Sequence, residues 1–257
     1  MIYTIEETNL RRQHLLADVL EPISLHALKD FSLPGNANIL DIGCGLGDTT
    51  MMLNRRFPNS AITGIDGDTS LIDVATDETR SRYPNLNFIC ADALHLPFDD
   101  NSFDLVFTRY CLHHLVSAQD GLKEMKRVCK PGGIVFAQEP DINAIVSYPE
   151  SRACTKHNEY IKLLFADALV GRKLISYFKQ LQLHGIGRNI GSVIGDESNS
   201  LKTFIAMTSV AIGEALLKNK LATKDEHQVL VMELKSIQDD PNVIIIMPPS
   251  IAVWGTK

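Results

Sequence analysis

A chain of 257 residues, 45% of them hydrophobic and 22% charged, is long enough and apolar enough for one globular domain with a substantial core. Its net charge of −6, with lysines and arginines scattered along the chain, argues against a nucleic-acid partner, because phosphates require a basic patch. No apolar run approaches the ~20 residues that span a bilayer, and the first residues lack the layout of a signal peptide. We therefore expect no membrane partner and a cytoplasmic location.

The cysteines give no sign of a disulfide framework or a metal site. They are five in number, which is odd, and they contain no C-x-x-C pair. We expect buried thiols at Cys44, Cys90, Cys111, Cys129 and Cys154.

The N-terminal segment, residues 1–30, is predicted to be helical. Apolar residues recur at helical spacings from Thr8 to Leu28, and Pro22 interrupts them. Because proline breaks a helix interior, this pattern predicts two short helices.

The most informative stretch is Asn38–Thr49. An apolar run, Ile39–Ile42, ends in glycines at alternate positions, and an amphipathic segment follows. This pattern predicts a strand, a tight turn and a helix. At Gly43, Gly45 and Gly47 a ligand can approach the main-chain N–H groups without meeting a Cβ, so the turn is a candidate binding site.

The spacing and charge of this turn distinguish between ligands. The dinucleotide fingerprint is G-x-G-x-x-G, whereas the spacing here is G-x-G-x-G followed by Asp48. Asp41 and Asp48 would repel a pyrophosphate, but both suit a ligand that carries an amine and a sulfonium. These features favour S-adenosylmethionine over a nicotinamide dinucleotide.

Strands and helices alternate from residue 38 to residue 139, which indicates a parallel sheet covered on both faces. The expected strands lie near 38–42, 61–65, 86–90, 104–108 and 133–139, and the expected helices near 47–57, 69–81 and 117–130. In such sheets a ligand lies beyond the carboxyl ends of the strands. Those ends carry Gly43, Asp66, Asp92, Arg109 and Glu139, which we therefore expect at one site.

The remainder of the chain is predominantly helical. We expect a loop over 140–150, helices over 151–170 and 171–183, a strand near 186–194 and a last strand over 251–256. An apolar stripe from Leu201 to Leu216 and a capping box at Thr223–Glu226 predict further helices. Residues 1–257 then form a single domain, with a core of 36–195 and 243–257 and a helical insertion of 196–240.

The motifs in this order resemble those of class I S-adenosylmethionine-dependent methyltransferases, within a broad group that acts on small molecules. Ile39–Gly47 is similar to the first motif of that family, and the further motifs are matched by 61–66, 90–93, 103–108 and 128–133. The resemblance implies an α/β fold with a Rossmann-like, doubly wound, seven-stranded sheet whose last strand is antiparallel. It also implies N-terminal helices that close over the cofactor and a helical lid at 196–240.

The resemblance further implies a site for S-adenosylmethionine, whose product is S-adenosylhomocysteine. Asp66 would bind both ribose hydroxyls and Asp92 would lie at the adenine, while Arg109 would hold the cofactor carboxylate or pair with a structural acid. The N-terminal cap is matched by Tyr3, Leu10 and Gln13. The expected cofactor-binding residues are Tyr3, Asp41, Gly43, Cys44, Gly45, Asp66, Gly67, Asp92, Ala93 and Arg109. No metal ligand is expected.

Two residues are candidates for catalysis. His113 could act as a base, because an imidazole titrates near ~6.5. Glu139 could face the substrate, or it could instead hold the cofactor loop through backbone amides. We expect His114 to be a structural residue packed under the next helix.

These patterns together predict methyl transfer to a small molecule by direct in-line displacement. The chain lacks the (Asn/Asp)-Pro-Pro-(Tyr/Phe) motif with which relatives methylate nucleobases and glutamine. The alternatives are a non-catalytic, S-adenosylmethionine-binding regulatory subunit and, less favoured, a nicotinamide-dependent dehydrogenase. The acceptor, the methylated atom and the oligomeric state stay open.

Overall fold

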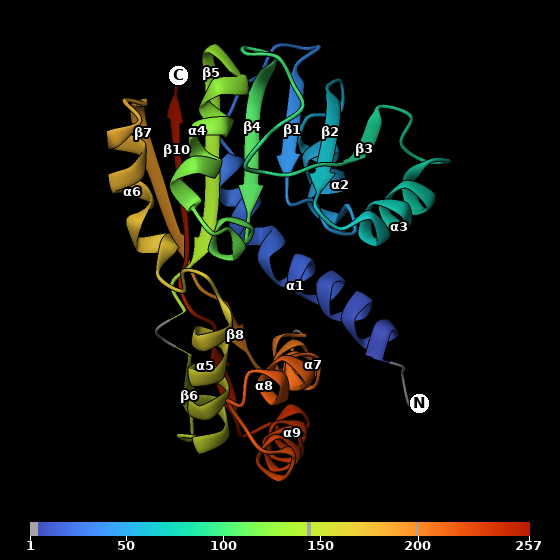
Figure 1. Cartoon of the computed structure of the whole chain (residues 1–257), viewed down its shortest axis with the longest axis vertical. Coiled ribbons are helices and arrows are strands. Elements are labelled where there is room, and N and C mark those ends of the chain that lie inside the picture. The colour runs from blue at the N-terminus through green and yellow to red at the C-terminus, as the bar shows by residue number, and fades with distance from the viewer. Residues whose placement is uncertain (1–4, 143–144, 199) are drawn as a thin grey trace.

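The computed structural model describes residues 5–142, 145–198 and 200–257, and Figure 1 shows a large sheet above a smaller helical part. The large sheet consists of β1 (Asn38–Ile42), β2 (Ala61–Asp66), β3 (Leu86–Cys90), β4 (Phe103–Arg109), β5 (Cys129–Pro140), β7 (His184–Gly191) and β10 (Ser250–Thr256). Its strand order is β3-β2-β1-β4-β5-β10-β7. Strands β1 to β5 run parallel, and β10 is antiparallel to both of its neighbours. The predicted fold class is therefore confirmed.

Strand order reverses between β1 and β4, which are neighbours in the sheet although β2 and β3 lie between them in the sequence. In open α/β sheets a crevice forms at the carboxyl ends of the strands on either side of such a point. The register pairs Ile42 with Thr108, so that the segments after β1 and β4 leave the sheet side by side.

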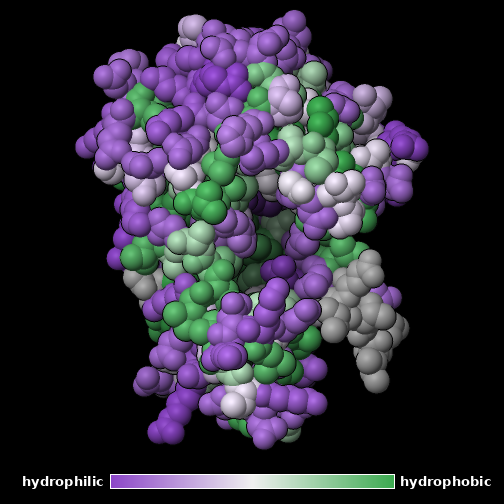
Figure 2. All heavy atoms as spheres, viewed as in Figure 1, coloured by the Kyte–Doolittle hydropathy of each residue, from purple (hydrophilic) through white to green (hydrophobic). Residues whose placement is uncertain are grey.

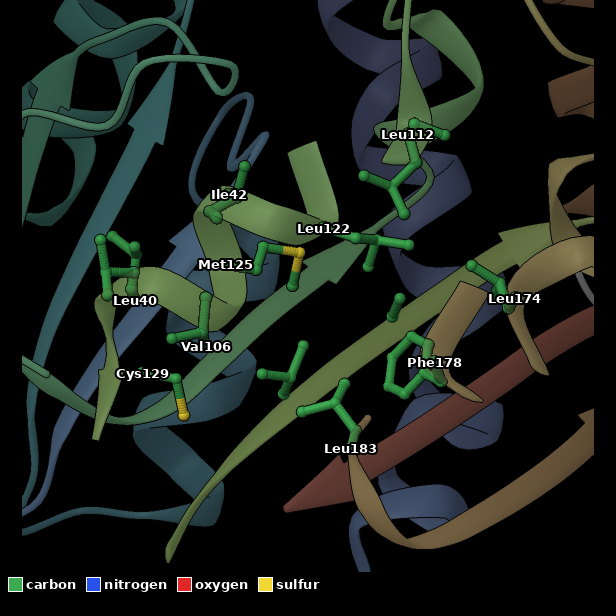
Figure 3. Close-up of a cluster of buried hydrophobic side chains, with 14 of the residues drawn as sticks. Leu40, Ile42, Val106, Leu112, Leu122, Met125, Cys129, Leu174, Phe178 and Leu183 are labelled. Carbon is green, nitrogen blue, oxygen red and sulfur yellow. The ribbon is translucent and has the colours of Figure 1, made fainter. Parts of the chain in front are cut away.

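Helices cover both faces of the large sheet. They are α2 (Asp48–Arg56), α3 (Thr69–Thr79), α4 (Ala118–Val128) and α6 (Val170–Gln180). Leu122 and Met125 of α4 and Leu174 and Phe178 of α6 are fully buried, and Figure 3 shows them converging on strand residues such as Val106. The buried positions of α4 recur every three or four residues, which is why this sequence forms a helix with one face on the sheet.

Helix α1 (Ile5–Leu28) runs unbroken beneath the carboxyl ends of the strands, so that the prediction of two helices separated at Pro22 is wrong. Proline removes one backbone hydrogen bond, here to the carbonyl of Asp18, and that residue is exposed to water. Leu20 is buried against the helical part, and Ala27 and Leu28 are buried against the sheet. Packing on both sides of the proline thus stabilises a single helix.

The smaller part contains α5 (Arg152–Leu164), α7 (Leu201–Ala211), α8 (Gly213–Lys218) and α9 (Lys224–Gln238), with a sheet of β6 (Val146–Tyr148), β9 (Ile244–Ile246) and β8 (Ile194–Gly195). The helices expected within 196–240 are present, and Thr223 and Glu226 form the predicted capping box. The loop expected over 140–150 contains β6, and residues 244–246, which we assigned to the core, pair with β6 and β8 instead. Strands of two or three residues are too short to produce a readable alternation in the sequence.

Three of the five predicted buried thiols are buried, namely Cys44, Cys129 and Cys154. Cys90 is exposed and Cys111 is partly buried, which corrects the prediction for these two. Cys90 is the last residue of β3 and Cys111 follows β4, so both lie where the chain leaves the core. In the described ranges, no helix is long and apolar enough to cross a bilayer.

Removing the Phe178 ring should destabilise the large sheet. Phe178 is fully buried, so Phe178→Ala is expected to lower the free energy of unfolding by about 3–5 kcal/mol. Urea unfolding can be followed by the fluorescence of Trp254, the single tryptophan. Leu163→Ala, at a position 62% exposed, is the control and should change stability by less than about 0.5 kcal/mol. Equal effects of the two substitutions would contradict the assignment of the core.

Candidate functional site

The glycine turn after β1 lies against the segment after β4. Gly43 has φ of 74°, and a Cβ at this position would come within 2.6 Å of the side chain of Cys111. Only glycine fits both conditions without strain. The amides of Gly43 and Cys44 both donate to the carbonyl of Ile65, at 2.8 and 2.9 Å, which ties the turn to the end of β2.

Asp66, at the end of β2, is held by two backbone amides. The amide of Gly45 donates to its Oδ2 and the amide of Asp68 to its Oδ1, each at 3.0 Å. The carboxylate is only partly buried, and the space around Gly67 is open. Asp66 is thus fixed in direction beside the glycine turn, with room next to it for a ligand.

Asp41 and Arg109 lie buried behind the turn. Oδ2 of Asp41 accepts from the Thr50 hydroxyl at 2.7 Å, whereas Oδ1 is buried and has no partner among the described residues. Burial raises the pKa of Asp41 to about 7, and the hydrogen bond from Thr50 and the charge of Arg109 act against this shift. Burial lowers the pKa of Arg109, which donates to Ser24 Oγ at 3.2 Å.

Helix α1 closes one side of the turn. A Cβ at Gly45 would lie 3.0 Å from Oε1 of Gln13, and Nδ1 of His14 lies 2.9 Å from Oδ2 of Asp48 at the start of α2. Gln13 is therefore at the turn, as the resemblance implied. Tyr3, another expected cap residue, lies outside the described residues.

Asp92 and Ala93 follow β3 at the same edge of the sheet. Oδ1 of Asp92 accepts from the amide of Leu94 at 2.9 Å, and Oδ2 lies 2.8 Å from Nδ1 of His95. The hydrogen bonds from His95 and Leu94 lower the pKa of Asp92. The side chain of Asp92 is exposed, so that it is available to a ligand beyond β3.

Glu139, at the end of β5, is completely buried and accepts from three groups. Its Oε1 accepts from the amides of Cys111 and Leu112, at 2.9 and 2.7 Å, and its Oε2 lies 2.6 Å from Nδ1 of His113. A carboxylate can only accept, so this contact places the proton of the imidazole on Nδ1 and leaves Nε2 as the possible base. Glu139 therefore holds backbone amides, as in the second of the two roles expected for it, but these amides belong to the segment after β4 and not to the glycine turn.

The two neighbouring histidines differ from the expectation in one respect. His113, in the short 3-10 helix Leu112–His114, is 3% exposed. His114 is exposed, and its ring meets that of His113 at a tilt and that of Phe165 edge-on, so that its prediction as a residue packed under the next helix is wrong. Tyr110, just before them, has φ of 56°, an uncommon conformation that turns the chain away from β4.

A cavity of about 310 Å³ adjoins this segment, between the end of the large sheet and the helical part, where Figure 2 shows the surface hollowed. Most of its lining residues are apolar, and they come from α1, α5, α7 and the segments that connect the sheet with the helical part. The polar groups on it are Asn9, Arg12, Tyr110, His113, His114, His157 and Thr208. Sequence reasoning missed Arg12 and His157, because α1 and α5 meet only in the folded chain.

No group of three or more His, Cys, Asp or Glu side chains that could hold a metal occurs in the part of the chain that the structure describes. The turn instead fits a cofactor with positive charge and hydrogen-bond donors. Such a cofactor needs hydrogen-bond acceptors in the protein, and the unpartnered Oδ1 of Asp41 is one of them. The open space at Gly67 lies next to the fixed carboxylate of Asp66, which is another.

Comparisons with known proteins agree with this geometry. Residues 39–133 match the family model described as a methyltransferase domain. Demethylmenaquinone methyltransferases of Staphylococcus aureus are 38% identical over 113 residues, which cover 44% of this chain and 46% of the relative. The chain therefore aligns with about half the length of these curated relatives.

Solved structures show the same fold over most of the chain. The YcgJ protein from Bacillus subtilis has a TM-score of 0.63 at 18% identity, covering 90% of this chain and 96% of that one. The Haemonchus contortus phosphoethanolamine N-methyltransferase 2, solved with S-adenosylhomocysteine, has a TM-score of 0.61 at 15% identity, covering 100% of this chain and 60% of that one.

The fold and the glycine turn thus define a Rossmann-like methyltransferase domain. More particularly, residues 39–133 match a methyltransferase domain, and the motifs and the sheet topology are those of the class I S-adenosylmethionine-dependent methyltransferase fold.

Replacing the Asp66 side chain should weaken cofactor binding severely. Hydrogen bonds to a charged group contribute roughly 1.5–3 kcal/mol each, so losing two in Asp66→Ala should weaken S-adenosylmethionine about a hundredfold or more. Calorimetric titration measures this affinity, and circular dichroism verifies the fold. Asp73→Ala, an exposed carboxylate on α3, is the matched control. An Asp66→Ala protein that is folded and binds with unchanged affinity would remove Asp66 from the site.

Proposed function

We propose that the protein transfers the methyl group of S-adenosylmethionine to a small molecule bound in the cavity, by direct in-line displacement. One observation carries the proposal: the glycine turn contacts the 110–114 segment, and that segment also lines the cavity. A ligand on the turn and a ligand in the cavity would therefore be neighbours.

When bound, S-adenosylmethionine supplies the methyl group and a neutral thioether as leaving group. The cofactor residues that we propose are Asp66 for the ribose hydroxyls, Asp92 with Ala93 for the adenine, and the turn of Gly43, Cys44 and Gly45 for the amino-acid portion. Asp41 lies behind this turn with an unpartnered oxygen, which suits the cationic end of the ligand. Arg109 contributes positive charge beside Asp41 and keeps that carboxyl from being an isolated buried charge.

His113 is the proposed base, and Glu139 is the proposed positioning residue. Glu139 fixes the ring through Nδ1, and His113 lines the cavity, so Nε2 is the nitrogen available to accept a proton from an acceptor hydroxyl or ammonium. The apolar walls exclude water from the same space, which favours transfer over side reactions.

The relatives and the cavity indicate which chemical class of methyl acceptor to expect. The curated ones are named as acting on demethylmenaquinone, and a cavity with mostly apolar walls suits an apolar small molecule. A non-catalytic cofactor-binding subunit remains the alternative of another class, and methyl transfer to any acceptor rules it out.

Changes at the His113–Glu139 pair should reduce the rate without changing cofactor affinity. General-base assistance contributes about 10²–10⁴-fold, so His113→Ala and Glu139→Gln should each lose at least about two orders of magnitude. Rates are measured across pH with saturating cofactor, once an extract screen with labelled cofactor has supplied an acceptor. His184→Ala, at an exposed histidine of β7, is the control. Rates near that of the wild type in both variants would leave positioning alone as the mechanism.

We also propose that α1 and residues 196–240 form a cover that tightens over bound ligands. A transfer site must open to exchange two ligands and exclude water in between. Hydrogen exchange of the amides in α1 and α7 should therefore slow when S-adenosylhomocysteine and an acceptor bind, while β1 and β4 serve as the internal reference. Equal protection with and without ligands in both helices would contradict a moving cover.

A further inference from the structure

The cavity contains one charge that nothing described in the protein neutralises. Arg12 is the only Asp, Glu, Lys or Arg among the described residues that line the cavity. Its Nε is buried without a hydrogen-bond partner, and no carboxylate forms an ion pair with its guanidinium among the described residues. Arg12 is partly buried, and burial lowers its pKa. A guanidinium nevertheless keeps its charge inside proteins, and a charge that is withdrawn from water is costly unless it is paired.

The other polar groups of the cavity do not supply a counter-charge. His157 is 2% exposed and its Nδ1 has no partner among the described residues. Burial lowers the pKa of His157 to about 4, so that this imidazole is neutral at neutral pH and offers a hydrogen bond only. Tyr110 and Thr208 are likewise neutral hydrogen-bonding groups.

Arg12 belongs to the acceptor side of α1. Asn9, Arg12 and Leu16 are spaced three and four residues apart and therefore share one helix face, which lines the cavity. Gln13 and His14 reach the glycine turn and the start of α2 instead. The charge of Arg12 also acts on the ring of His114, which places it near the proposed base.

We propose that Arg12 binds an acidic oxygen of the acceptor, so that the cavity selects apolar organic anions, carboxylates or ionised hydroxyls, over neutral analogues of the same shape. This inference rests on the proposed function. It assigns Arg12 as a specificity-determining residue that fixes which end of an apolar acceptor lies near His113.

The test compares two probes of nearly the same shape, the anion 2-naphthoate and the neutral 2-naphthamide, titrated calorimetrically into protein saturated with S-adenosylhomocysteine. A hydrogen-bonded ion pair in an apolar cavity should make the naphthoate bind at least about tenfold more tightly to the wild type. Arg12→Met should abolish this preference and leave the affinity for S-adenosylhomocysteine unchanged. Arg12→Lys should retain part of the preference, and Arg11→Met, at the exposed neighbouring arginine, should retain all of it.

Several results would overturn the proposal: equal affinity of the wild type for both probes, no binding of either, or a preference that survives Arg12→Met. A loss of S-adenosylhomocysteine affinity in Arg12→Met would overturn it too, because Arg12 would then serve the cofactor. Failure of the proposed function would give a different result, because the wild type would then not bind S-adenosylhomocysteine at all.

A third probe, 2-naphthol, distinguishes between a carboxylate and an ionised hydroxyl as the acidic oxygen of the acceptor. Its hydroxyl titrates near the phenolic value of about 10. Affinity that rises from about pH 7 toward about pH 9 in the wild type, and not in Arg12→Met, assigns an ionised hydroxyl. Affinity for 2-naphthol that does not depend on pH, together with the naphthoate preference, assigns a carboxylate.

Discussion

The buried carboxylate of Glu139 is the constraint on which the arrangement of the site depends. A carboxylate with no exposed surface is costly unless its oxygens accept hydrogen bonds, and here both do. Its donors all come from the segment after β4, while Glu139 itself ends β5. One side chain therefore fixes that segment, including His113, against the edge of the sheet. The glycine turn after β1 then packs on Cys111 of the same segment, so that the cofactor side and the cavity share one wall.

Helix α1 provides the second shared wall, and buried polar contacts hold it in place. Ser24 Oγ donates to Gln138 Oε1 at 2.9 Å, and Gln138 Nε2 donates to Ser250 Oγ at 2.8 Å, which connects α1 through β5 to β10. Arg109 donates to the same Ser24. The C-terminal half of α1 is thereby fixed on the sheet, while its first half extends over the turn and the cavity. A helix held firmly at one end is suited to close over two ligands at the other.

The large sheet could be predicted because its strands and helices are each long enough to show their period. Ile39–Ile42 before the glycines and the apolar face of α4 are examples, and the strand-end residues Asp66, Asp92 and Glu139 followed from the sheet topology. The helix break at Pro22 was wrong, because tertiary packing outweighed a local cost of about 3 kcal/mol. The pairing of β6, β8 and β9 escaped prediction because each is only two or three residues long.

The acceptor side could not be predicted for a related reason. Its polar groups come from α1, α5, α7 and the segment after β4, and no spacing in the sequence connects Arg12 with His157. The pattern around Arg109–Leu115 drew attention to two histidines but not to which one is buried, since that depends on the contact with Glu139.

The central claim is that cofactor and acceptor meet across the segment that Glu139 holds. A crystal structure with S-adenosylhomocysteine tests it most directly. The account predicts the ribose hydroxyls on the carboxylate of Asp66 and the thioether sulfur at the edge of the cavity, beside Tyr110 and His113. A nucleoside bound away from Asp66, or a sulfur that faces away from the cavity, would contradict it.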